Sequence, residues 1–329
     1  MLTRRRLIAS SAVAVSAPNF LGRAARADAS AGSWPNRPIH LIVPLAAGGP
    51  TDIVARLLAD QLSKTLGQQV VVENKSGAGT NLANEYVARA EPDGYTALYA
   101  TSSLATNVGL YRSLSYNAAT DLAPVSLVAK FPFFMIVPNS SPAKSIAEFI
   151  ADAKANPGKR IIASPGTGSA PQLAEVLFMQ MAGIKLVQAP YRGAAPALVD
   201  LIPGRVDCYF GSGELLTYSR AGQVRALATT GAERSPAEPE LPTIAEAGLA
   251  GYAVDSWQGV FLPAKTPPDI VNKLSGETVA ALATPGVKDA LARNAYTAQG
   301  SSPEELGKWL QADTEKWIGV IKTAGIKID

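Results

Sequence analysis

The 329-residue chain has a single histidine, His40, and a single cysteine, Cys208. A lone histidine inside an apolar run argues against a Ser-His-Asp triad, and no histidine and cysteine residues have the spacing of a metal site. An internal disulfide is excluded, and we expect Cys208 to be a buried structural thiol. The sequence has no G-x-S-x-G elbow and no P-loop lysine. These absences argue against hydrolytic, metal-dependent and nucleotide-dependent chemistry, and no cofactor is expected.

The chain has no excess of positive charge once residues 1–27 are set aside. Residues 1–27 contain three consecutive arginines, then an apolar run, then a small-residue cleavage pattern ending at Ala27. This is typical of an export signal, because the apolar run is too short to cross a membrane. The arginines resemble a twin-arginine signal, and a Sec signal is the alternative. Without the five arginines of this segment the net charge changes from +3 to −2, so we expect neither a nucleic-acid partner nor direct membrane insertion.

The stretch 39–52 predicts a strand, a glycine loop and a helix in immediate succession. An apolar, β-branched run ends at Pro44, Gly48 and Gly49 follow, and apolar residues recur at helical spacing from Ile53 onward. Free backbone amides and the positive end of a helix dipole would then point at one place, which suits an anion. An ordinary strand-to-helix turn is the alternative that this stretch alone leaves open.

Strands and helices alternate along the rest of the chain, which predicts an α/β protein with parallel sheets. A second glycine loop at 165–171 also follows a predicted strand and precedes a predicted helix. Two long extended segments, 122–137 and 252–262, are candidates for crossings between two units. The predicted units are one lobe of residues 34–131 plus 253–329, and a second lobe of residues 132–252. Ligands bind in clefts between facing loops of such lobes.

Short motifs follow one another in a fixed order along the chain. They are Pro44-x-x-Ala47-Gly48-Gly49-x-x-Asp52, Glu73-Asn74-Lys75-x-Gly77-Ala78-Gly79, Pro92-Asp93-Gly94-Tyr95-Thr96, Gly166-x-Gly168-Ser169, Pro190-Tyr191-Arg192-Gly193, Gly204-Arg205-Val206-Asp207 and Ser256-Trp257-x-Gly259. In this ordered set, which runs from about Trp34 to Asp329, the chain resembles the Bug receptors. These are the extracytoplasmic solute receptors of tripartite tricarboxylate transporters.

The resemblance implies a type II periplasmic-binding-protein fold, with two α/β lobes joined by two crossover strands and a ligand cleft between them. It implies a periplasmic receptor that grips a small organic carboxylate, partly through bound water, and delivers it to membrane transporter subunits. We expect a monomer and no catalysis. A ligand sensor that signals to a membrane kinase is one alternative. An exported α/β enzyme is another, although the missing acid–base pair argues against it.

The resemblance also implies the residues of the ligand site. The first loop would contribute Ala47, Gly48, Gly49 and Asp52, and the second Ser164, Gly166, Thr167, Gly168 and Ser169. Further candidates for specificity lie at the ends of other predicted strands, namely Ser102, Tyr191 and Ser212, and another, Asp207, lies within the predicted strand 206–210. For these the alternative is a structural role, because hydroxyl and carboxylate side chains after strands often cap helices.

Three positions depart from the family pattern, and one of them, Pro203 in place of a usual glycine before Gly204, is expected to be structural. Leu45 stands where an aromatic residue usually follows the first proline, which puts ring stacking on the ligand in doubt. Gln172 stands where the second loop usually leads to a histidine. A glutamine can form hydrogen bonds but cannot titrate, so a pH-linked role at this position is lost.

Overall fold

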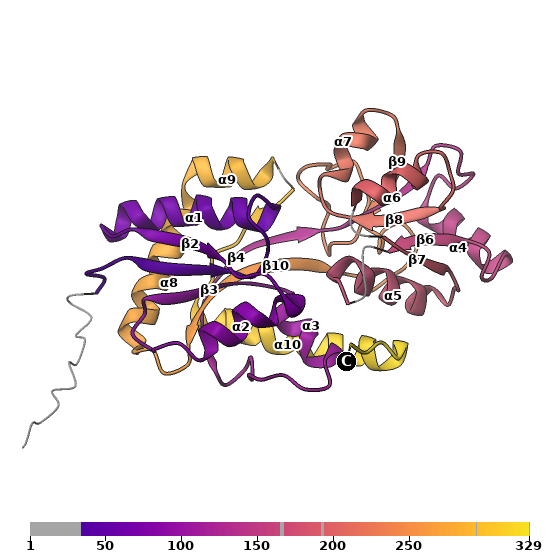
Figure 1. Cartoon of the computed structure of the whole chain (residues 1–329). Helices are drawn as coiled ribbons and strands as arrows, with labels where there is room; N and C mark the ends of the chain where they lie inside the picture. The colour runs from indigo at the N-terminus through magenta and orange to yellow at the C-terminus, as the bar shows by residue number, and fades with distance from the viewer. Residues whose placement is uncertain (1–33, 165–167, 192–193, 294, 329) are drawn as a thin grey trace, which may run out of the picture.

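The computed structural model describes residues 34–164, 168–191, 194–293 and 295–328 (Figure 1). The predicted export signal, residues 1–27 with its cleavage site near Ala27, lies outside the described residues, as do Gly166 and Thr167. The described chain forms two lobes, each built on its own sheet with helices on both faces (Figure 1).

The first sheet has six strands in the order β11-β4-β10-β3-β1-β2. They are β1 (Ile39–Val43), β2 (Val70–Asn74), β3 (Thr96–Thr101), β4 (Leu122–Pro132), β10 (Asp255–Pro263) and β11 (Thr297–Ala298). Strand β1 runs parallel to β2 and β3, whereas β10 is antiparallel to both β3 and β4. Therefore β1, β3 and β4 point the same way, and their carboxyl ends share one edge of the sheet.

The second sheet has five strands in the order β7-β6-β8-β5-β9. They are β5 (Phe134–Pro138), β6 (Ile161–Ser164), β7 (Val187–Pro190), β8 (Cys208–Gly211) and β9 (Val224–Thr229). Only Phe133 separates β4 from β5, so the chain passes directly from one sheet to the other. Because β5 is antiparallel to β8 and its first residue pairs with Gly211, the carboxyl end of β8 lies at the edge nearest the first lobe.

The crossing predicted at 122–137 is confirmed by this direct passage from β4 to β5. The second predicted segment, 252–262, contains the return of the chain, and from Asp255 onward it forms β10, whose partners all belong to the first sheet. The chain returns just before β10, where the Val254 amide donates a hydrogen bond to the carbonyl of Thr230.

Helices cover both faces of each sheet because side chains alternate along the strands. In β1, Leu41 and Val43 pack against α1 (Pro50–Leu66), α8 (Pro268–Ala283) and α9 (Pro285–Ala292) on one face of the sheet. Ile42 points to the other face, which is covered by α2, α3 and α10. The remaining helices are η2 (Ala78–Thr80), α2 (Asn81–Ala88), α3 (Ser103–Leu110), α4 (Ile146–Ala155), α5 (Ala170–Ala182), α6 (Ala194–Leu201), α7 (Leu215–Arg220) and α10 (Pro303–Ala324). In the second lobe α4 and α5 cover one face, and α6 and α7 the other.

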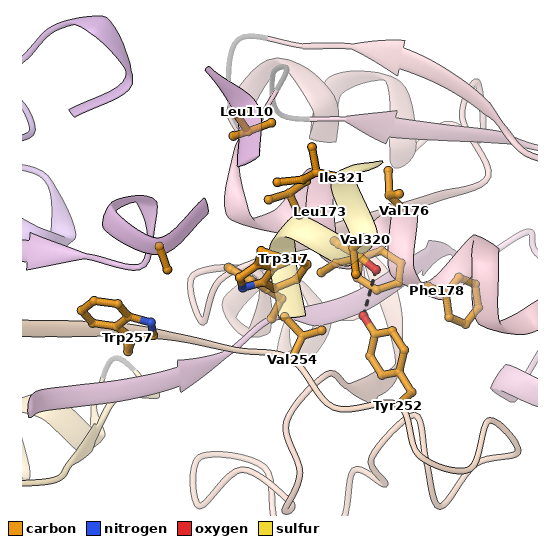
Figure 2. Close-up of a cluster of buried hydrophobic side chains, with 14 of the residues drawn as sticks. Leu110, Leu173, Val176, Phe178, Tyr252, Val254, Trp257, Trp317, Val320 and Ile321 are labelled. Atoms are coloured by element: carbon orange, nitrogen blue, oxygen red, sulfur yellow. Dashed lines mark hydrogen bonds between the residues drawn. The ribbon is translucent and has the colours of Figure 1, made fainter. Parts of the chain in front are cut away.

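The last helix, α10, joins the two lobes. It begins as the sequence predicts, since Ser302 and Glu305 form a reciprocal capping box. Side chains of α10 and α5 belong to one buried cluster, together with Leu110 at the end of α3 (Figure 2). The Tyr252 hydroxyl extends this cluster into the second lobe by donating a hydrogen bond of 3.0 Å to the carbonyl of Ala174 (Figure 2). One side of the gap between the lobes is therefore closed by apolar packing.

We expect Trp317→Ala to lower the free energy of unfolding by about 3–5 kcal/mol, because it leaves a cavity in this cluster. Trp317 is 2% exposed, whereas its neighbour Ile318, which lies beside Gly109 of α3, is 39% exposed. The control Ile318→Ala should therefore cost clearly less, about 1 kcal/mol or less. Urea unfolding followed by circular dichroism measures both, and equal effects of the two substitutions would contradict the packing described.

Candidate functional site

The carboxyl ends of both sheets face the gap between the lobes. In the first lobe, Ala47, Gly48 and Gly49 follow β1, and Ser102 follows β3. In the second lobe the sequence-predicted residues also lie at the facing edge, because β6 and β7 run parallel to β8. These residues are Ser164 at the end of β6, Gly168 and Ser169 before α5, Tyr191 after β7 and Ser212 after β8. The topology thus brings most of the predicted residues to two opposed edges.

Asp52 organises the first loop. Its carboxylate accepts hydrogen bonds from the Gly48 amide at 2.8 Å, from Arg56 Nε at 2.9 Å and from Asn74 Nδ2 at 2.9 Å. The Arg56 hydrogen bond is the main cause that lowers the pKa of Asp52 to about 2, with the Gly48 and Asn74 bonds adding to it and burial opposing it. Asp52 is 2% exposed, so it shapes the loop from behind and is not the group that faces a ligand.

The second loop repeats this arrangement with neutral groups. The Gly168 amide donates to Gln172 Oε1 at 2.5 Å, and Gln172 Nε2 donates to Gln188 Oε1 at 3.3 Å. Both Gly48 and Gly168 have left-handed backbones, with φ of 81° and 77°. In each loop a left-handed glycine therefore binds a side chain four residues later. Gln172 fixes the conformation of its loop through this hydrogen bond. The glutamine that departs from the family pattern at this position therefore has a structural role.

These two hydrogen bonds within the loops change which backbone amides can hold an anion. The sequence predicts that the loop glycines offer their amides to an anion, but the amides of Gly48 and Gly168 donate hydrogen bonds inside the loops. The first hydrogen bond of α1 runs from the Ile53 amide to the Gly49 carbonyl. The amides of Thr51 and Asp52, in the first turn, therefore have no acceptor within the helix. The positive end of the α1 dipole lies at the same place.

A buried polar network lies beneath the first loop. The Tyr99 hydroxyl donates to Gln258 Oε1 at 2.7 Å, and Gln258 Nε2 donates to Thr51 Oγ1 at 3.1 Å. Nearby, the hydroxyls of Ser102 and Ser256 lie 2.9 Å apart, and both residues are buried. Ser102 therefore supports the site from within in this conformation. Sequence reasoning did not find Tyr99 or Gln258, although Gln258 lies inside the Ser256-Trp257-x-Gly259 motif.

A buried acid lies behind the second loop. Glu175 on α5 has no solvent exposure, and burial raises its pKa well above the usual value, with the Ser164 hydroxyl opposing the shift. Within the described part of the chain, neither the Glu175 carboxyl nor the Ser164 hydroxyl makes a hydrogen bond of acceptable geometry, although the two are neighbours. Burial therefore favours the neutral, protonated form of Glu175. The sequence signal was hidden because Glu175 lies in a mostly apolar helix.

Two predicted specificity residues have structural partners instead. Asp207 lies at the amino end of β8, where its carboxylate accepts hydrogen bonds from the Ile161 amide at 2.7 Å and from Arg160 Nη1 at 3.2 Å. That is the edge away from the first lobe, where the Asp207 carboxylate has structural partners within the second lobe. The Tyr191 hydroxyl donates to Asp200 at 2.7 Å, which leaves its backbone as the part nearest the gap.

The largest cavity described, of about 730 Å³, does not coincide with these loops. It lies at the other end of the first lobe and is lined by residues such as Arg37, His40 and Tyr86. His40 Nδ1 is 2.6 Å from Glu73 Oε1 at its rim.

The described residues contain no group of three or more histidine, cysteine or acidic side chains placed to bind a metal ion. They also include no helix with the length and apolar character of a membrane span.

Comparison with known proteins identifies the family. Residues 54–326 match the model of the tripartite tricarboxylate transporter family receptor. The chain belongs to this receptor family. It is 35% identical over 305 residues to the protein BugT of Bordetella pertussis, which covers 92% of this chain and 94% of BugT.

Solved structures of the family have the same fold. Rpa4515 of R. palustris, solved with adipate, is 38% identical with a TM-score of 0.78, and the match covers 90% of this chain and 100% of Rpa4515. MatC from Rhodopseudomonas palustris, solved with bound malate, is 33% identical with a TM-score of 0.74, over 88% of this chain and 100% of MatC. The expected two-lobed fold and the expected role as a solute receptor rather than an enzyme are confirmed by these relationships.

We expect Asp52→Asn to lower the free energy of unfolding by about 1–2 kcal/mol at pH 7, after allowance for the solvent-exposed side chain of Arg56. The folded-state pKa of Asp52, about 2, is below its ordinary value of 3.8. Its contribution is therefore present above pH 3.8 and is lost as the pH falls toward 2.

Urea unfolding at several pH values between 7 and 2.5 measures this contribution. The difference between wild type and Asp52→Asn should shrink as the pH falls. The control is Asp60→Asn, since Asp60 and Lys64 form an exposed pair on the same helix. It should cost about 0.5 kcal/mol or less. A pH-independent difference for Asp52→Asn would contradict the proposed charge interaction.

Proposed function

We propose that this protein is a periplasmic receptor that captures a small organic carboxylate in the cleft between its lobes and delivers it to a tripartite tricarboxylate-type transporter. The observation that carries the proposal is a pair of loops on the facing edges of the two sheets, each at a helix N-terminus. Each loop is fixed by a hydrogen bond from a glycine amide to the side chain four residues later. The adipate and malate held by Rpa4515 and MatC support the choice of a carboxylate.

The proposed site needs no cation. Loop residues at the N-termini of α1 and α5 present amides to the cleft, and each helix adds the positive end of its dipole. A hydrogen bond to a charged group contributes about 1.5–3 kcal/mol, so two or three of them support binding in the micromolar range, at about 8 kcal/mol. The proposed ligand residues are Ala47, Gly49, Ser164, Gly166, Thr167, Ser169, Ser212 and the backbone of Tyr191, with Gly48, Asp52, Ser102 and Gly168 as supports.

Closure would follow from contacts to both lobes. A ligand bound to residues 34–131 and 253–329 on one side and to 132–252 on the other stabilises the closed state, because only that state makes both sets of contacts. The two short passages at Phe133 and before β10 are the natural pivots, since each is a brief connection between sheets. The α10 cluster would keep one side of the gap closed during this movement.

The proposed partners are the transporter's membrane subunits, and the receptor would act as an exported monomer. Deletion of the gene should abolish uptake of the ligand carboxylate by intact cells. If uptake persists and a transcriptional response to the ligand is lost instead, the protein would be a sensor and the transport proposal would fail.

We expect Gly49→Val to weaken carboxylate binding by roughly 10- to 100-fold, the equivalent of one charge-assisted hydrogen bond. Gly49 has φ of −76°, and an added Cβ would lie 3.5 Å from the Ala46 carbonyl oxygen. The fold should therefore accept valine, while the new methyl groups keep the ligand away from the loop. Gly168→Val is a poorer test, because its Cβ would lie 2.8 Å from Ile328 and 2.9 Å from Leu110.

Titration calorimetry with a carboxylate selected by a thermal-shift screen measures the effect. Gly286→Val serves as the control, because Gly286 lies near the start of α9 with no atom within 4 Å of an added Cβ. The control should bind as wild type does. Unchanged affinity in Gly49→Val, with an unchanged melting temperature, would remove the first loop from the site.

A further inference from the structure

Glu214 stands at the edge of the second lobe that faces the first. It follows the carboxyl end of β8, where Gly211 pairs with Phe134, the first residue after the crossing. It also lies directly before α7, and this helix contacts the first lobe. Leu216 of α7 shares a buried cluster with Ala295 of the first lobe. The Glu214 backbone is therefore held beside the gap, two residues after the candidate residue Ser212.

The charge of Glu214 acts on a tyrosine of the opposite lobe. Burial, and after it the charge of Glu214, raises the pKa of Tyr296. The Tyr296 hydroxyl also interacts with Gln258, which in turn holds Thr51 at the start of α1. Hydrogen bonds thus link Thr51 at the start of α1 through Gln258 to Tyr296, and the pKa of Tyr296 responds to the charge of Glu214.

Few groups around Glu214 favour the charged form of its carboxyl. Its side chain reaches solvent, yet enough protein surrounds the carboxyl that burial raises its pKa. Backbone hydrogen bonds from its own amide and from Ser212 oppose this shift. Among the described residues, no cation contributes to the shift. An ionised carboxylate can only accept hydrogen bonds, so this group favours a partner that donates them.

We propose that Glu214 is a specificity-determining residue that accepts a hydrogen bond from an ammonium group of the ligand. The receptor would then select a carboxylate that also carries an amino group over the matched acid without one. This inference rests on the proposed function, because the ligand's carboxylate must be held by the two loops. Selection has an attractive and a repulsive part, since a second carboxylate placed near Glu214 would face a like charge.

Titration calorimetry at pH 7.5 with matched ligand pairs tests the proposal. The pairs are aspartate and succinate, glutamate and glutarate, and 2-aminoadipate and adipate. We expect the amino member of the best-bound pair to bind wild type at least about 10-fold more tightly than its partner. In Glu214→Gln the two affinities should come within about threefold, because the amino acid binds more weakly and the plain diacid more tightly.

The control is Glu240→Gln, which removes an exposed carboxylate of the same lobe and should leave both affinities unchanged. A melting temperature of Glu214→Gln close to that of wild type would show that the fold is intact. If plain carboxylates bind wild type as well as or better than their amino partners, or if Glu214→Gln leaves the ratio unchanged, the inference fails and the proposed function stands. If no carboxylate binds wild type, the proposed function fails as well.

Discussion

A hydrogen bond from a left-handed glycine to a side chain four residues later recurs in both lobes, and the proposed site depends on it. Gly48 uses the carboxylate of Asp52, and Gly168 uses the amide of Gln172. In each loop the bond fixes a tight turn at a helix N-terminus, so that the remaining amides can face the gap. Only a residue that tolerates positive φ without strain can occupy the turn, which explains the glycine.

The framework around these loops is packed at one side of the gap, and the proposed closure would occur at the other side. Apolar packing between α10 and α5 ties the lobes together at one side of the gap. The two passages of the chain between the sheets are short. In the first lobe, the side chains of Thr51, Tyr99 and Gln258 are already hydrogen-bonded to one another. A network that is already satisfied need not rearrange when the lobes approach each other.

Much of the fold could be predicted from sequence because its signals are local. Helical spacing after Ile53, the capping residues Ser302 and Glu305, and the apolar strands all depend on residues close in the chain. The site was only partly predictable, because its supports join distant residues. The contact between Thr51 and Gln258 spans 207 positions, and no local pattern indicates it. Asp207 shows the same limit, since only strand direction decides which edge of the sheet it occupies.

The charge balance of the cleft now has a physical explanation. An anion site made of amides and helix dipoles supplies only partial positive charges, so it binds one carboxylate without fixing the rest of the ligand. Discrimination must then come from groups farther along the cleft. Burial favours the neutral form of Glu175, which adds no charge to the site, whereas the role proposed for Glu214 places a carboxylate in the cleft. If the proposed site holds its carboxylate through amides alone, a single negative charge beyond the two loops is sufficient to give the selectivity proposed for Glu214.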